Sequence, residues 1–400
     1  MNAAEPGRAD QVDVVVLGAG AAGFMAAIEA GKRGKSVVLL DHAETIGEKI
    51  RISGGGRCNF TNVNAGPKNF VSENPKFCVS ALARYKPRDF LAMVEKHKIE
   101  WYEKTLGQLF CRNSANDIIE MLLDELAASG GLLVTGADVR DIDKAEDFQV
   151  FTTRGNWRAP RLIVATGGPS IPKIGASGFA YELAARFGVP VVRPRPALTP
   201  FLFSEEMKAR SGKLAGVSTE VTAQAPGSPV FREAGLFTHR GLSGPALLQA
   251  SSYWRQGQPL TVDFAPGRDL AAELIAAKST NPRREIATAL GAGLPQRLAG
   301  FLAEEVSAWG TLADASHAEL RRVAAAIHAL DMRPVGLEGW RIAEVAAGGV
   351  DVRALDSQSM EVRAVPGLHF IGECLDVTGW LGGYNFQWAW ASGAAAGRAM

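Results

Sequence analysis

The stretch from Val12 to Asp41, VDVVVLGAGAAGFMAAIEAGKRGKSVVLLD, decides the fold of this chain. It predicts a buried strand at 14–17, a turn with the glycine pattern GxGxxG, a helix at 24–30 and a second strand at 37–40. The second strand runs directly into the acidic side chain of Asp41. Strand, glycine turn, helix, strand and acid follow one another in the order of a dinucleotide-binding fold.

Each glycine of this turn has its own predicted role. Gly18 permits a tight turn, Gly20 leaves room for a pyrophosphate, and Gly23 lets the helix pack closely on the sheet. The free N–H groups at the start of the helix favour phosphate there. Asp41 lies 23 residues after Gly18, where an acid binds a ribose hydroxyl and favours a 2′-OH over a 2′-phosphate. The residues that we expect around the pyrophosphate are Gly18, Gly20, Ala21 and Ala22, and Gly23 completes the predicted cofactor-binding turn.

Size, charge and cysteine spacing exclude several classes of protein. A chain of 400 residues suggests two or three domains, and a net charge of +1 gives no global reason to expect nucleic acid or an anionic membrane as partner. No apolar run reaches the roughly 18 residues of a membrane span, and residues 1–11 read as a disordered tail without a signal peptide. The four cysteines form no CxxC pair, so we expect no metal site, and their spacing fits a reduced cytoplasm.

A second glycine-rich stretch follows at residues 47–62, with the sequence GEKIRISGGGRCNFTN. Three consecutive glycines suit a loop whose backbone lies against a flat ligand. The positive charges on both sides of the glycines and the polar groups after them could form ion pairs and hydrogen bonds with such a ligand. The alternative interpretation is a flexible polar loop. The residues expected to contact a cofactor here are Lys49, Gly55, Gly56, Arg57, Cys58 and Asn59.

Together these two motifs resemble the BaiN-like (YhiN-type) FAD-binding flavoproteins, a family often labelled aminoacetone oxidase-like. Further stretches similar to this family are LIVATGG at 162–168, LFTHRGLSGP at 236–245, AAGGV at 346–350 and GECLDVTGWLGGYN at 372–385. The resemblance covers essentially the whole chain after residue 11. It implies an α/β fold, with a Rossmann-like FAD-binding domain of the glutathione-reductase type that a β-rich domain and a helical segment interrupt.

The distribution of predicted strands and helices gives the expected domain boundaries. Residues 12–190 and 335–400 are predicted to form the FAD-binding domain, since a proline-rich stretch starts at 190 and glycine motifs return after 346. Alternating strands predict a barrel-like domain at 191–266, and helical periodicity predicts a helical segment at 267–334. No second GxGxxG occurs in the inserted part, so a separate NAD(P)H-binding domain is not expected.

Glycine motifs at both ends of the chain favour FAD, because FAD is long and its two halves need separate cradles. A predicted strand at 161–165 runs into small residues that let the backbone pass close to a cofactor. The last helix is expected to point its N-terminus at the flavin. The remaining expected cofactor contacts are Thr166, Gly167, Gly372, Glu373, Asp376, Gly383, Tyr384 and Asn385. NADH or NADPH is considered as a transient electron donor.

Three classes of function stay open. The first is an FAD-dependent oxidoreductase that passes a hydride between flavin N5 and a small organic substrate. Reduction of a conjugated double bond would need a proton donor, a role for His239 or Tyr384, although His239 is also explained as an ordinary turn residue. An amine oxidase using oxygen would run the hydride in the opposite direction.

The second class is a flavin-dependent RNA-modifying enzyme, and the third is an FAD-binding scaffold without catalysis. A local cluster of basic residues at 193–213 favours RNA, whereas the near-zero net charge argues against it. The sequence predicts no membrane partner and leaves the substrate and the oligomeric state open.

Overall fold

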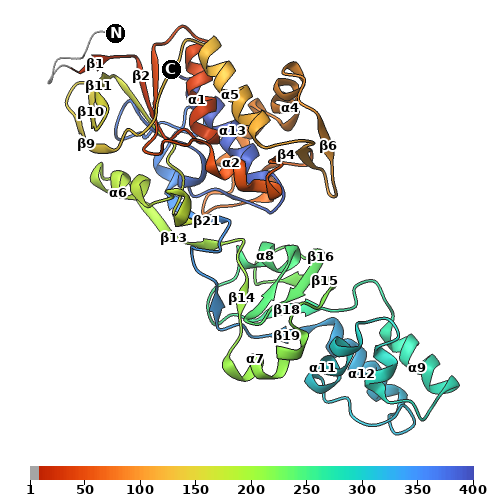
Figure 1. Cartoon of the computed structure of the whole chain (residues 1–400). Coiled ribbons are helices and arrows are strands. Elements are labelled where there is room, and N and C mark those ends of the chain that lie inside the picture. Colours follow the sequence, from red (N-terminus) through yellow and green to blue (C-terminus); the bar gives the residue numbers. More distant parts are fainter. Residues whose placement is uncertain (1–8) are drawn as a thin grey trace. The chain divides into compact units, whose positions relative to one another are not determined.

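The computed structural model describes residues 9–400, which form two compact units (Figure 1). The first unit comprises the chain up to Arg195 together with Val345–Met400, and the second comprises Pro196–Glu344. The second unit contains both strands and helices, so the inserted parts that the sequence divides at 266/267 belong to one compact body.

The core of the first unit is a five-stranded parallel sheet with the order β22-β12-β2-β3-β8. Its strands are Leu368–Phe370 (β22), Arg161–Val164 (β12), Val14–Leu17 (β2), Val37–Leu40 (β3) and Leu132–Val134 (β8). All residues of β2 and β3 are buried, as expected for strands covered on both faces. The strands predicted at 14–17 and 37–40 are therefore confirmed.

Two helices from opposite ends of the chain pack against each other beside this sheet. Helix α1, Ala21–Gly31, contacts α13, Tyr384–Gly397 (red and blue in Figure 1). Glycines make this close approach possible, because a Cβ on Gly393 would lie 2.5 Å from the carbonyl oxygen of Ala22. Inside the turn, a Cβ on Gly23 would lie 1.9 Å from the Gly18 oxygen. The helix predicted at 24–30 is present and begins three residues earlier.

The first strand of the structure corrects the prediction of a disordered tail at 1–11. Strand β1, Asp10–Gln11, pairs in parallel with β11, Gly155–Ala159. The tail prediction is wrong at these two residues, because the edge of β11 offers backbone partners that the sequence pattern does not reveal. The rest of the predicted tail, residues 1–8, lies outside the described residues.

Smaller elements complete the first unit. The strands are β4 Asn59–Asn62, β5 Phe70–Val71, β6 Trp101–Glu103, β7 Gln108–Cys111, β9 Val139–Lys144, β10 Phe148–Thr152, β13 Val191–Ala197, β21 Val345–Val350 and β23 Thr378–Gly379. The helices are α2 Glu48–Ile52, α3 Cys78–Arg84, α4 Pro87–Lys96, α5 Asn116–Ala128 and α6 Phe179–Arg186. Strands β4, β7 and β6 form their own antiparallel sheet, which carries the end of the glycine-rich loop.

The second unit is built on a seven-stranded antiparallel sheet with the order β19-β18-β15-β16-β17-β14-β20. Its strands are β14 Phe201–Leu202, β15 Ser218–Gln224, β16 Phe231–Phe237, β17 Gly241–Ser243, β18 Leu260–Asp263, β19 Leu330–Met332 and β20 Gly336–Leu337. Its helices are α7 Glu205–Ser211, α8 Pro245–Ser251, α9 Leu270–Thr280, α10 Ile286–Leu290, α11 Gln296–Glu305 and α12 His317–His328. Among residues 9–400, every helix is too short or too polar to cross a bilayer.

A buried carboxylate ties α5 to its neighbours in the first unit. Glu125 is 3 % exposed and accepts hydrogen bonds from Lys32 at 2.6 Å and Lys96 at 2.5 Å, with His97 at 2.9 Å. Burial opposes ionisation of this group, but the hydrogen bonds from His97, Lys32 and Lys96 outweigh it and lower its pKa to about 2.

We therefore expect Glu125→Gln to lower the free energy of unfolding at neutral pH by about 2–3 kcal/mol, because the cations lose their shared acceptor. A lowered pKa stabilises the fold above the unfolded pKa, and this contribution disappears as the pH falls toward 2. Denaturant unfolding from pH 7 to pH 3 should thus bring the wild type and the variant closer together. A difference that stays constant down to pH 3 would contradict the assignment.

Candidate functional site

The glycine turn after β2 leaves open space at the start of α1. Gly18 has φ +100° and a Cβ there would lie 2.6 Å from the Ala165 oxygen, so only glycine fits. At Gly20, in contrast, a Cβ would meet no described heavy atom within 4 Å. No side chain caps the helix that follows, so its first N–H groups face this space and suit a phosphate.

Asp41 lies against this turn at the end of β3. One carboxylate oxygen accepts the N–H of Ala19 at 2.6 Å, and the other accepts the N–H of Ala43 at 2.9 Å. A carboxylate offers about four acceptor positions, so both oxygens retain capacity for a ribose hydroxyl. The structure thus brings Asp41 beside the predicted pyrophosphate turn.

Three predicted cofactor stretches meet in one polar cluster, formed by Lys49, Ser170 and Glu373. Lys49 donates to Ser170 Oγ at 2.6 Å and forms an ion pair with Glu373. Ser170 Oγ donates to Glu373 Oε1 at 2.7 Å, and the Ala346 N–H donates to the same oxygen at 3.2 Å. These residues come from the glycine-rich loop, the turn after β12 and the segment after β22, so the cluster joins parts far apart in the sequence.

Two buried polar atoms, one near the Gly18 turn and one near this cluster, have no hydrogen-bond partner in the described part of the chain. They are Thr166 Oγ1 and the hydroxyl of Tyr181. A Cβ on Gly168 would lie 2.9 Å from the Tyr181 hydroxyl and 3.3 Å from Glu373 Oε1, which places the tyrosine next to the cluster. Burial raises the pKa of Tyr181, so the phenol stays protonated. Such unsatisfied groups fit a site that is completed by a polar ligand.

The glycine-rich loop exposes its backbone and buries its cysteine. Gly55 and Gly56 have positive φ and open space at their Cβ positions among the described residues. Arg57 is exposed. Cys58 is fully buried, and burial raises the pKa of its thiol. The Asn59 amide lies 3.1 Å from that of Gln108, so this side chain already has a partner on the neighbouring strand β7.

The segment from Gly372 to Asn385 is held largely by its own contacts. A Cβ on Gly383, at φ +92°, would lie 2.5 Å from the Thr61 oxygen. The Asn385 amide accepts the N–H of Gly379 at 2.8 Å and donates to its carbonyl oxygen at 3.0 Å. Asp376 is 4 % exposed and accepts the N–H of Glu73 at 2.8 Å, and burial raises its pKa. These contacts fix the loop that leads into the uncapped start of α13.

The two candidate proton donors lie in different units. Tyr384 is 8 % exposed in the first unit, with edge contacts to the rings of Phe70 and Trp380. His239 is exposed in the turn between β16 and β17 of the second unit. Thr238 Oγ1 accepts the N–H of Gly241 at 3.0 Å and holds this turn without the histidine. The catalytic roles of both residues stay predictions.

The basic cluster predicted at 193–213 is divided in the structure. Arg193 and Arg195 belong to the first unit, whereas the other cations belong to the second. There, Lys208 pairs with Glu205 at 2.7 Å, and Arg210 pairs with Glu305. Two of the five cations of the predicted cluster are thus paired with carboxylates nearby.

Ser170 and Tyr181 are site residues that the sequence analysis missed. Ser170 follows the TGGP turn, which is the one sequence signal that could have pointed to it. Nothing in the local pattern around Tyr181, inside α6, marks a buried hydroxyl. All four cysteines are free and buried, and the described residues contain no group of three or more metal-ligating side chains.

Comparison with known proteins shows the family to which this chain belongs. Residues 12–399 match the model of the HI0933-like protein Rossmann domain. Over 389 residues, 96 % of each chain, the protein is 44 % identical to a ribosomal RNA dihydrouridine synthase from Escherichia coli. A protein of the same name from Haemophilus influenzae is 42 % identical over 95 % of this chain and 96 % of its own. A 3-dehydro-bile acid delta(4,6)-reductase from Clostridium scindens is 30 % identical over 96 % of this chain and 98 % of its own.

These matches bear on the fold and on the class of cofactor. The predicted Rossmann-like FAD-binding fold is confirmed, and the family membership supports the FAD-dependent oxidoreductase superfamily. The residues around the turn fit such a cofactor, since Gly20 offers space, Asp41 offers acceptors, and Thr166 and Tyr181 offer unsatisfied polar groups.

Proposed function

This chain belongs to the HI0933-like Rossmann family, the BaiN-like (YhiN-type) flavoproteins that its motifs predict, and we propose that it reduces a uracil base in ribosomal RNA to dihydrouracil. The observation that carries this proposal is full-length identity of 44 % and 42 % to two proteins that both bear the name ribosomal RNA dihydrouridine synthase. It ranks the RNA-modifying alternative above the small organic substrate that the sequence alone favours.

The reaction adds two hydrogens across a carbon–carbon double bond conjugated to a carbonyl. FAD, once reduced, supplies a hydride for such a bond. The carbon β to the carbonyl takes the hydride, the α carbon takes a proton, and the double bond becomes a single bond. NADH or NADPH is the proposed source of the electrons.

The residues of this chain have distinct proposed tasks in that reaction. Gly20 and Asp41 hold the pyrophosphate and the ribose of the cofactor. The cluster of Lys49, Ser170 and Glu373 fixes the three segments around it. The proton for the α carbon is proposed to come from the buried phenol of Tyr384 or, as the alternative, from the imidazole of His239.

A second candidate is reduction of a small unsaturated ketone. It is supported by the relative from Clostridium scindens, which is named for the reduction of double bonds in a 3-dehydro-bile acid. The bond to be reduced is of the same type as in uracil, because in each of the two substrates it is a carbon–carbon double bond conjugated to a carbonyl. The lower identity of 30 % places this candidate second.

The experiment uses purified protein and ribosomal RNA from a strain that lacks the gene. We expect yellow protein whose flavin absorbance is bleached by NADH or NADPH without oxygen and restored by that RNA. Nucleoside mass spectrometry should then detect dihydrouridine in the RNA. Unchanged RNA together with reoxidation by an unsaturated ketone would favour the second candidate, and reduction of the flavin by an amine, with oxygen as acceptor, would favour an amine oxidase.

A further inference from the structure

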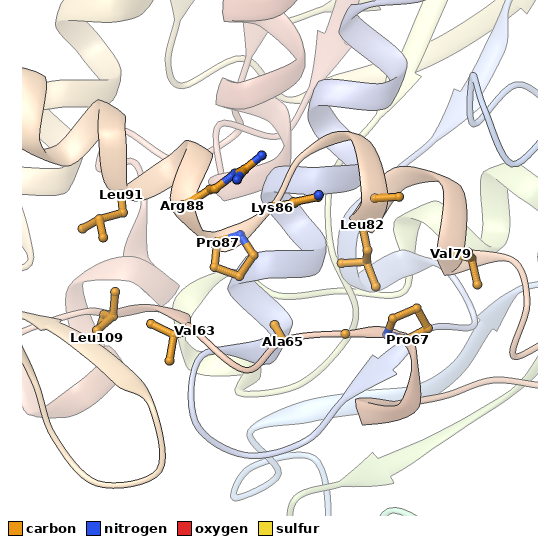
Figure 2. Close-up of a pocket in the computed structure, with 12 residues that line it drawn as sticks. Val63, Ala65, Pro67, Val79, Leu82, Lys86, Pro87, Arg88, Leu91 and Leu109 are labelled. Atoms are coloured by element: carbon orange, nitrogen blue, oxygen red, sulfur yellow. The ribbon is translucent and has the colours of Figure 1, made fainter.

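A groove in the first unit lies between helices α3 and α4 on one side and residues 63–67 on the other (Figure 2). It encloses about 410 Å³. Its lining is mainly apolar, with side chains from Val63, Pro67, Val79, Leu82, Leu91 and Leu109. Val63 is 47 % exposed and Val79 is 44 % exposed, so the groove presents apolar surface that the fold itself does not cover.

Two cations lie on one edge of this groove (Figure 2), Lys86 in the connection from α3 to α4 and Arg88 in the first turn of α4. In the described part of the chain, no acceptor forms a hydrogen bond or an ion pair with the ammonium of Lys86, which is exposed. The Arg88 side chain is 78 % exposed and forms only a long ion pair with the half-exposed Asp89, with 3.9 Å between Nε and Oδ1. Both charges are therefore available to an anionic partner.

The wider segment around the groove concentrates positive charge. Residues 57–112 contain ten Lys and Arg against five Asp and Glu, although the whole chain has a net charge of only +1. The rest of the chain is therefore net negative. A polyanion would be attracted to this segment in preference to other parts of the protein.

The groove is tied directly to the predicted flavin segments. Val63 follows β4, in which the Asn62 side chain donates to the Gly382 carbonyl oxygen at 2.9 Å. Thr61 on the same strand donates to Gln387 of α13 at 2.6 Å. Leu109, on the groove wall, pairs with Thr61 across the β4–β7 ladder. A ligand in the groove would thus bind to the same unit that carries the predicted cofactor segments.

From these observations we propose that the groove binds a single-stranded segment of the ribosomal RNA substrate, which rests on the function proposed above. The apolar lining contacts an unstacked base, and Lys86 and Arg88 contact the adjoining phosphates. Sequence-specific RNA binding uses such splayed bases together with cations along the backbone. An apolar surface beside two exposed cations matches that chemistry better than it matches a neutral ligand or a protein helix.

The test uses a groove variant that carries both Lys86→Glu and Arg88→Glu. Its charge-matched control carries both Arg321→Glu and Arg322→Glu, at exposed positions of α12 in the second unit. Binding of ribosomal RNA is measured over a range of salt concentrations. We expect the groove variant to bind at least about tenfold more weakly, with a salt slope reduced by about one to two units. The control should bind like wild type, and both should retain FAD.

A second variant tests the apolar lining, with Val63→Ser and Val79→Ser at positions already exposed. KM for RNA should rise about tenfold while reduction of the flavin by NAD(P)H is unchanged, since no cofactor contact is altered. If wild type forms dihydrouridine but the groove variants keep wild-type affinity and KM, the groove proposal is wrong and the proposed function stands. Equal losses in the groove variant and the control would also overturn it. If wild type neither binds nor reduces ribosomal RNA, both proposals fail.

Discussion

Gly20→Val is expected to give a folded protein that contains no FAD. Gly20 has φ −92° and ψ −173°, an extended conformation that valine readily adopts. Its Cβ would meet no described atom within 4 Å, so the apoprotein tolerates the side chain. The valine would instead fill the space predicted for the pyrophosphate. We expect FAD affinity to fall at least about 100-fold, equal to about 2.7 kcal/mol.

The matched control is Gly300→Val in α11, where a Cβ also has no described neighbour within 4 Å. Flavin absorbance relative to protein and thermal unfolding are measured for both variants. The control should stay yellow, while the Gly20 variant should be colourless with an unfolding transition close to that of the wild-type apoprotein. Gly23→Val would not serve this purpose, since its Cβ would collide with the Gly18 oxygen at 1.9 Å and disturb the fold itself. A fully flavinylated Gly20→Val protein would refute the predicted phosphate site.

The parts of the fold that the sequence predicts are those specified by local pattern. The apolar runs at 14–17 and 37–40 predict buried parallel strands, because a strand covered on both faces needs no polar alternation. The glycines of the first turn also act locally, through φ and through the volume of a missing side chain. Strand β1 escaped prediction because two polar residues carry no strand pattern, and their pairing depends on the edge of β11.

The candidate site is harder to predict, because its contacts join distant parts of the chain. Lys49 and Glu373 were each predicted to contact the cofactor, but the sequence gives no sign that the two side chains pair with each other across 324 positions. Cys58 was expected near the flavin, and its burial in the core, at φ +46°, is a feature that the sequence does not indicate. The unsatisfied hydroxyl of Tyr181 results from burial by other segments. Tertiary packing, which residue spacing does not encode, decides all three.

Breaking the ion pair between Lys49 and Glu373 should weaken FAD binding through the position of the loops. The side chains are 31 % and 17 % exposed, so each charge is partly shielded from water. Replacing one partner leaves the other charge without its counter-ion, which costs more than removing both. We expect Lys49→Met and Glu373→Gln each to raise the Kd for FAD by about 10- to 100-fold.

The double variant should recover part of this loss, with a coupling energy of about 1–3 kcal/mol. FAD titration of the apoproteins measures the coupling, and thermal unfolding without FAD separates it from stability. The control is the exposed ion pair between Arg232 and Glu220, 2.8 Å apart in the second unit. A double-mutant cycle of Arg232→Met and Glu220→Gln should give almost no coupling energy, because solvent screens this ion pair. Strictly additive losses at Lys49 and Glu373 would mean that the two residues act independently. The ion pair would then not be what holds the glycine-rich loop against the segment after β22, and the cofactor would have to be positioned by the backbone of each segment alone.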